Sequence, residues 1–97
     1  MPVRIWGIDA NSRPFIQLAT ARNVSEGGAL LDGMHCPLRP GEVVDVQYNS
    51  VKAEFLVVWA GKQGTALEGE IGLQSLPTQP VLWDSYLERA AEFEGKG

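Results

Sequence analysis

Cysteine is nearly absent from this 97-residue sequence, which contains only Cys36. A single cysteine cannot form a disulfide within the chain, and structural disulfides belong to oxidising compartments. Long apolar runs are also absent, so no segment has the length of a signal-peptide core or of a transmembrane helix. We therefore expect a cytoplasmic protein that has no membrane partner.

Positive charge is scarce as well, because eight lysines and arginines stand against twelve aspartates and glutamates, a formal net charge of −4. A protein that neutralises many phosphates needs the opposite balance, so we expect no nucleic-acid partner. His35 and Cys36, the only histidine and cysteine, are too few to hold a metal, and no nucleophile is paired with a base. The sequence predicts a binding module rather than an enzyme, with no metal and no cofactor.

Short segments of β-type residues alternate with turn residues along most of the chain. A chain of this length builds one hydrophobic core, and an open sheet of short strands would expose its edges. We therefore expect a single domain of the all-β class, a small six-stranded antiparallel β-barrel in residues 1–77, followed by one C-terminal α-helix and tail in residues 78–97. The expected strands are residues 3–8, 15–24, 29–31, 42–48, 51–60 and 70–76.

The clearest hairpin joins the fourth and fifth expected strands through Asn49 and Ser50, a two-residue turn in which asparagine accepts a positive φ. Its register places apolar residues opposite apolar ones on one face and polar residues opposite polar ones on the other. Strict alternation then puts Trp59 on the same face as Phe55 and Val57. The expected pairs are Tyr48 with Val51, Val46 with Ala53, Val44 with Phe55, Gln47 with Lys52, and Asp45 with Glu54.

An amphipathic helix is expected from Val81 to Phe93, because the hydrophobic period changes there from two residues to that of a helix. Pro80 suits its first turn and Gly95 its end. We expect Leu82 and Trp83 to pack on the barrel, together with Tyr86. The expected apolar stripe is Leu82, Trp83, Tyr86, Leu87, Ala90, Ala91 and Phe93.

Residues 23–28 (Asn-Val-Ser-Glu-Gly-Gly) combine a side-chain amide at Asn23, a hydroxyl at Ser25 and paired glycines. Such a turn can read the edge of a purine, because it offers a donor, acceptors and a closely approachable backbone. The alternative is an ordinary Asx or Ser turn that ends a strand. The three tryptophans could stack on bases, but the acidic composition favours packing roles for them.

The same run resembles the Asp/Asn-x-Ser-x-x-Gly signature of the PilZ domain family, at Asn23, Ser25 and Gly28. It is followed at the usual distances by Leu38–Val44 (Leu-Arg-Pro-Gly-Glu-Val-Val) and by Ile71–Gln74 (Ile-Gly-Leu-Gln). The resemblance extends from about Val3 to Leu76. It implies a six-stranded barrel with a C-terminal helix, and a bacterial receptor that binds cyclic di-GMP at this turn and relays occupancy to a protein partner.

One departure from the family concerns arginine. Members that bind cyclic di-GMP carry Arg-x-x-x-Arg just before the first strand, where two guanidinium groups clamp the ligand. Here the only register that begins with arginine is Arg4 to Ile8, so the second arginine is missing. Arg22, beside Asn23, and Arg4 are candidate replacements at the site. Arg13 and Arg39 are further possible substitutes, and solvated surface charge is the alternative for all four. The sequence therefore predicts weak binding of cyclic di-GMP; the alternative is a nucleotide-independent adaptor that acts through protein contacts.

Overall fold

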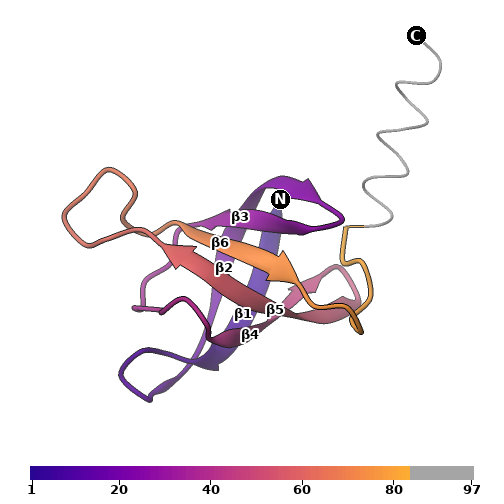
Figure 1. Cartoon of the computed structure of the whole chain (residues 1–97), viewed down its shortest axis with the longest axis horizontal. Helices are drawn as coiled ribbons and strands as arrows, with labels where there is room; N and C mark the ends of the chain where they lie inside the picture. Colours follow the sequence, from indigo (N-terminus) through magenta and orange to yellow (C-terminus); the bar gives the residue numbers. More distant parts are fainter. Residues whose placement is uncertain (84–97) are drawn as a thin grey trace, which may run out of the picture.

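The computed structural model describes residues 1–83, and all regular structure within them is β-strand (Figure 1). The strands form one closed antiparallel barrel, which confirms the expected all-β architecture. Figure 1 shows the loop between β5 and β6 projecting from one end of it. The strands are β1 (Pro2–Ile8), β2 (Pro14–Ser25), β3 (Gly28–Asp32), β4 (Val43–Tyr48), β5 (Val51–Ala60) and β6 (Ile71–Ser75).

The order of strands around the barrel is β1-β2-β3-β6-β5-β4, and β4 pairs with β1 to close it. The β4–β5 hairpin has the predicted register at every pair, from Tyr48 opposite Val51 to Val44 opposite Phe55. Asn49 has a φ of 56°, as expected for the first residue of this tight turn. Local turn chemistry and alternation were therefore sufficient to define this hairpin.

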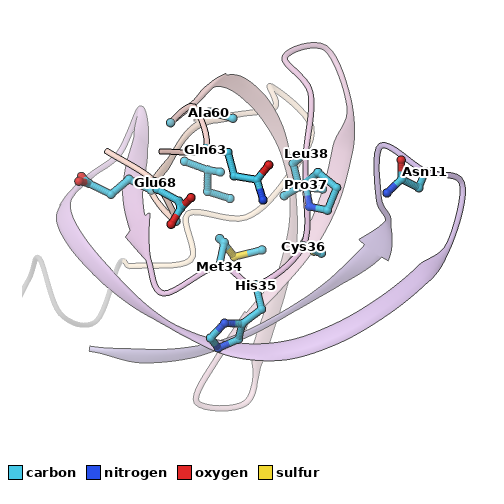
Figure 2. Close-up of a pocket in the computed structure, with 13 residues that line it drawn as sticks. Asn11, Met34, His35, Cys36, Pro37, Leu38, Ala60, Gln63 and Glu68 are labelled. Atoms are coloured by element: carbon cyan, nitrogen blue, oxygen red, sulfur yellow. The ribbon is translucent and has the colours of Figure 1, made fainter. Parts of the chain in front are cut away.

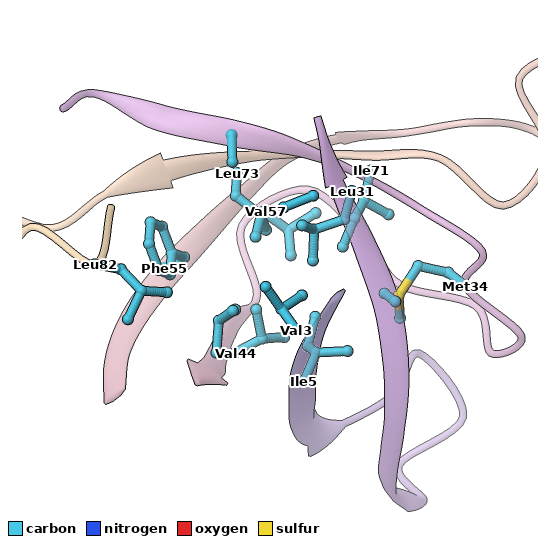
Figure 3. Close-up of a cluster of buried hydrophobic side chains, with 14 of the residues drawn as sticks. Val3, Ile5, Leu31, Met34, Val44, Phe55, Val57, Ile71, Leu73 and Leu82 are labelled. Atoms are coloured by element: carbon cyan, nitrogen blue, oxygen red, sulfur yellow. The ribbon is translucent and has the colours of Figure 1, made fainter. Parts of the chain in front are cut away.

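The core fills the inside of the barrel with alternate residues from the strands (Figure 3). Ile5 of β1 pairs with Val46 of β4, and both side chains are buried, as are those of Val3 and Val44. In Figure 3, Leu82 lies beside Phe55 at one end of the core, whereas Met34 lies at the other end. The two ends of the barrel are thus closed by different segments of the chain.

Trp83 closes the end that contains Phe55. Its side chain is fully buried, with its ring 5.5 Å from that of Tyr48 and 6.1 Å from that of Phe55. The expected packing of Leu82 and Trp83 on the barrel is confirmed. Residues 81–83 form a coil and turn, so the prediction that a helix begins at Val81 is wrong. The other residues of the predicted helix, including Tyr86 and Phe93, lie outside the described residues. Residues 1–83 contain no helix that could cross a membrane.

The prediction for Trp59 is wrong as well. A β-bulge falls between Val57 and Trp59, because Val57 pairs with Leu73 and Trp59 pairs with the preceding residue of β6, Gly72. The extra residue in β5 turns the indole out of the core and onto the outer surface, where Trp59 is 38% exposed. The bulge therefore moves a large aromatic ring from the interior to the outer wall.

Candidate functional site

The hairpin between β2 and β3 contains the Asn-x-Ser-x-x-Gly residues. Ser25 pairs with Gly28, so Glu26 and Gly27 form a two-residue turn, and β2 ends at Ser25, one residue beyond its predicted end. The register shifts between Arg22 and Ser25, and Asn23 has a φ of 49° at this bulge. Asparagine tolerates this left-handed conformation better than most residues. The bulge thus explains why asparagine suits this position.

The turn is fixed to the end of β6 by Ser75. The Ser75 hydroxyl donates to the carbonyl of Glu26 at 2.8 Å, and the Ser75 amide donates to the carbonyl of Gly27 at 2.9 Å. These bonds join residues about fifty positions apart in the chain. The turn is therefore held against the barrel wall.

Gly28 of β3 lies close against the backbone of β6. Its φ is 155°, and a Cβ atom at this position would lie only 1.9 Å from the backbone oxygen of Leu73. Any side chain would force the two strands apart, because neither backbone can move without breaking its pairing. Gly28 therefore has a packing role in the wall of the site.

Gly72 of β6 allows Trp59 to lie on the outer surface of the sheet. A Cβ atom on Gly72 would lie 2.1 Å from Nε1 of Trp59, so the indole occupies the space that a side chain would fill. The bulge in β5 turns the ring outward and the missing side chain of Gly72 lets it come down on the strand. Together these features place an aromatic ring beside the β2–β3 turn.

A shallow hollow of about 340 Å³ lies between Trp59 and the turn. Within residues 1–83 neither the Asn23 amide nor the Ser25 hydroxyl takes part in a hydrogen bond, so both can serve a ligand. Within residues 1–83, no charged side chain is among those that line the hollow. The lining residues are Asn23, Ser25, Gly27, Gly28, Ala29, Leu30, Val58, Trp59, Gly72 and Leu73.

Three of the five predicted site residues, Asn23, Ser25 and Gly28, therefore line one hollow, whereas the two arginines do not. Arg22 points to solvent and forms an ion pair with Asp32 at 3.4 Å. Arg4 lies on the outer face of β1 and lines a different hollow. For both arginines, the position of the side chain fits the alternative of surface charge.

Sequence reasoning missed Trp59 and Gly72 as neighbours of the turn. The available signal was Gly72 itself, because a glycine inside a strand often marks a bulge or the close approach of another group. A tryptophan on the adjacent strand is a group that could use that space. Their pairing across β5 and β6 brings this aromatic ring into the hollow with Asn23 and Ser25.

The start of β1 lies close to this site. The amide of Ala21 donates to the carbonyl of Met1 at 2.7 Å, and the amino group of Met1 lies 3.3 Å from the carbonyl of Ala21. Ala21 precedes Asn23 by two residues. A segment joined to the amino end of β1 would therefore leave the barrel beside the turn.

A larger hollow of about 690 Å³ lies at the end of the barrel marked by Met34 (Figure 2). In Figure 2, Glu68 and Asn11 lie on opposite sides of it. Burial raises the pKa of the Cys36 thiol, and the nearby carboxylates of Asp9 and Glu42 add to the effect. The thiol is thus kept in its protonated, weakly nucleophilic form. Among residues 1–83 there is no group of three His, Cys, Asp or Glu side chains that could hold a metal.

A scan of known protein families finds no match to this chain, and neither does a search of curated proteins. The likeness to PilZ domains therefore consists of the quoted motifs and of a six-stranded antiparallel barrel.

Proposed function

We propose that this chain is a PilZ-type binding module that receives one guanine of cyclic di-GMP in the hollow between Trp59 and the β2–β3 turn. The observation that carries the proposal is the convergence of an amide, a hydroxyl and an aromatic ring on one uncharged hollow. Asn23 and Ser25 come from the turn, whereas Trp59 comes from a strand on the far side of β6. The module acts in the cytoplasm without turnover, and occupancy is passed to a protein partner.

The chemistry of the hollow suits a purine. A carboxamide presents a donor and an acceptor, and a hydroxyl presents both, so Asn23 and Ser25 match the mixed polar edge of guanine. The exposed face of Trp59 offers stacking, which contributes about 1–3 kcal/mol for a base. Gly28 and Gly72 have no side chains, so a flat ring can approach the wall closely.

The affinity is expected to be low. Cyclic di-GMP carries two phosphate charges, the chain has a net charge of −4, and none of the cationic residues in the described part of the chain lines the hollow. A hydrogen bond to a charged group contributes about 1.5–3 kcal/mol. The lack of two arginine contacts therefore lowers affinity by about a hundredfold or more. Orientation by the turn and stacking on Trp59 remain.

Calorimetric titration with cyclic di-GMP tests the proposal. We expect weak binding by the parent chain, and strong, salt-sensitive binding after an Arg-x-x-x-Arg segment is added directly before Pro2, beside Ala21. The matched control adds Gln-x-x-x-Gln at the same place and has the affinity of the parent. Asn23→Ala in the arginine variant removes the gain. Failure of the arginine variant to bind would overturn the proposal, and low-micromolar binding by the parent would overturn the expected weakness.

The second candidate is an adaptor that keeps the barrel but binds no nucleotide. The observation in its favour is that no cationic side chain from residues 1–83 lines the hollow, together with the solvent-exposed positions of Arg4 and Arg22. An adaptor gives no heat with cyclic di-GMP in either the parent or the arginine variant, and it acts through protein contacts alone. The same titration therefore separates the two candidates.

A further inference from the structure

The outer face of β1 and its two neighbours carries large apolar side chains in open solvent. Ile16 is 68% exposed and Leu18 is 66% exposed, although both lie in the middle of a paired strand. Trp6 lies directly opposite Ile16 and is half-buried. Isolated exposed apolar residues are ordinary, but a contiguous group on one wall marks an interaction surface.

Strand register arranges this surface in two adjacent rows. In one row, Trp6 lies between Ile16 of β2 and Asp45 of β4; in the next row, Arg4 lies between Leu18 of β2 and Gln47 of β4. Neither Arg4 nor Asp45 forms an ion pair within residues 1–83, where Arg22 and Asp32 form the one recorded. We call this surface the β1 face; it consists of Arg4, Trp6, Ile16, Leu18, Asp45 and Gln47.

The β1 face is not flat. A hollow of about 390 Å³ lies on it and is lined by Arg4, Trp6, Ile16 and Gln47, together with residues around Pro14. A side chain from a facing surface can enter this space. Leu18 projects from the same face just beside it, so the face contains both a hollow and a projecting apolar group.

We infer that the β1 face is the surface through which two copies of this chain associate as a symmetric dimer. A two-fold axis that lies across the strands brings each row against the other row of the partner copy. Ile16 then meets Leu18, and Trp6 meets Arg4, an apolar pair and a cation–π pair. Asp45 lies against Gln47 and beside Arg4 of the partner copy. Each contact occurs twice.

The other two-fold arrangement, with the axis along β1, is unfavourable. It brings Arg4 against Arg4, places Asp45 against the apolar side chain of Ile16, and buries Gln47 against Leu18. The face is therefore complementary to itself in one orientation only. This self-complementarity favours a second copy over an unrelated partner, which would need its own matching pattern.

Sedimentation equilibrium between about 1 µM and 1 mM tests the inference, because this range covers weak protein association. We expect a reversible monomer–dimer equilibrium in the parent chain. Leu18→Glu should weaken it by about a hundredfold, because the two copies each bury an unpaired charge. The control is Leu67→Glu, at a residue that is 51% exposed in the loop between β5 and β6 and should leave the dimer unchanged. Equal melting temperatures of both variants show that folding is intact.

A charge exchange tests the orientation. Arg4→Asp puts an aspartate beside Asp45 of the partner copy, and Asp45→Arg puts an arginine beside Arg4 of the partner copy. Each substitution should therefore prevent self-association, because the neighbouring charges repel each other. An equimolar mixture of the two variants should associate, since position 4 of each copy then has a charge opposite to that of position 45 of the other copy. Three outcomes would each overturn the inference and leave the β1 face to a different protein. They are a parent chain that stays monomeric at 1 mM, a dimer that is insensitive to Leu18→Glu, and a mixture that fails to associate. The inference does not depend on nucleotide binding.

Discussion

Two walls of the same barrel differ in what their outward positions carry. On the wall formed by β3, β6 and β5, Gly28 and Gly72 bring strands and an indole close together, and the result is a shallow uncharged hollow. On the wall formed by β2, β1 and β4, the outward positions carry Trp6, Ile16 and Leu18, and the result is a projecting apolar surface. The core beneath both walls is continuous.

The contrast shows how one small barrel can hold two recognition surfaces. Outward side chains lie outside the continuous core, so their size can change without changing the strand order, except where two strands pack as closely as at Gly28. A glycine at an outward position exposes the backbone, so a flat small molecule can bind close to it. A large apolar side chain at an outward position favours contact with a protein surface instead. The size of the outward side chain therefore separates the two walls.

The largest effect is expected from the core that both walls share. Trp83→Ala should lower the free energy of unfolding by about 3–5 kcal/mol, because the fully buried indole packs against Tyr48 and Phe55. Trp83→Phe is the matched control and should cost much less, since it keeps an aromatic ring and removes an N–H group that has no partner within residues 1–83. Denaturant unfolding checks both, and an unchanged midpoint for the alanine variant would contradict a shared core.

On the wall with the hollow, Gly28→Ala should cost about 2–4 kcal/mol, because it combines a backbone clash with an unfavourable φ. Gly27→Ala is the control next to it in the sequence, where a Cβ atom would meet nothing closer than the Ser25 hydroxyl at 3.8 Å. Urea unfolding of both variants measures the difference. Equal stabilities would mean that β3 and β6 can separate freely at this point.

Gly72→Ala should change the hollow more than the fold. The added Cβ collides with the five-membered ring of Trp59, so the whole indole must rotate away, at a cost of about 1–2 kcal/mol. In the arginine-bearing variant, cyclic di-GMP should then bind at least tenfold more weakly, because the stacking surface is displaced. Self-association through the β1 face should not change. Loss of both properties together would show that the two walls are coupled.

The smallest effect is expected from Glu54→Lys on β5. Asp45 and Glu54 lie directly opposite each other, and a like-charge pair at this position is unfavourable. The substitution should raise the free energy of unfolding by about 0.2–0.5 kcal/mol, and Glu54→Gln by less. High salt should reduce both gains. A loss of stability with lysine would mean that the two carboxylates do not repel each other in the fold.

Most of the barrel could be predicted from the sequence, because its hairpins are specified by local features. Asn49 and Ser50 set a two-residue turn, and alternation fixed the β4–β5 register on both sides of it. The same reasoning failed at Trp59, because Val57, Val58 and Trp59 are all apolar and their sequence gives no sign of a one-residue slip. A bulge depends on what the neighbouring strand permits, here the missing side chain of Gly72.

The candidate site was predictable in part for the same reason. Asn23, Ser25 and Gly28 are neighbours in sequence, and the turn brings them to one hollow. The arginines were harder to place, because the face on which a strand residue lies depends on the whole barrel. Arg4 falls on the β1 face, and Arg22 is paired with Asp32. Long-range pairing, rather than local propensity, decides which charges reach a site.

The three tryptophans divide the molecule into three separately observable regions. Trp83 lies inside the barrel, Trp59 lies at the hollow and Trp6 lies on the β1 face. A chain that retains only one of them, with phenylalanine at the other two positions, has an intrinsic fluorophore in one region alone. Its emission and its quenching by iodide then follow unfolding, ligand occupancy or association individually, without any attached dye.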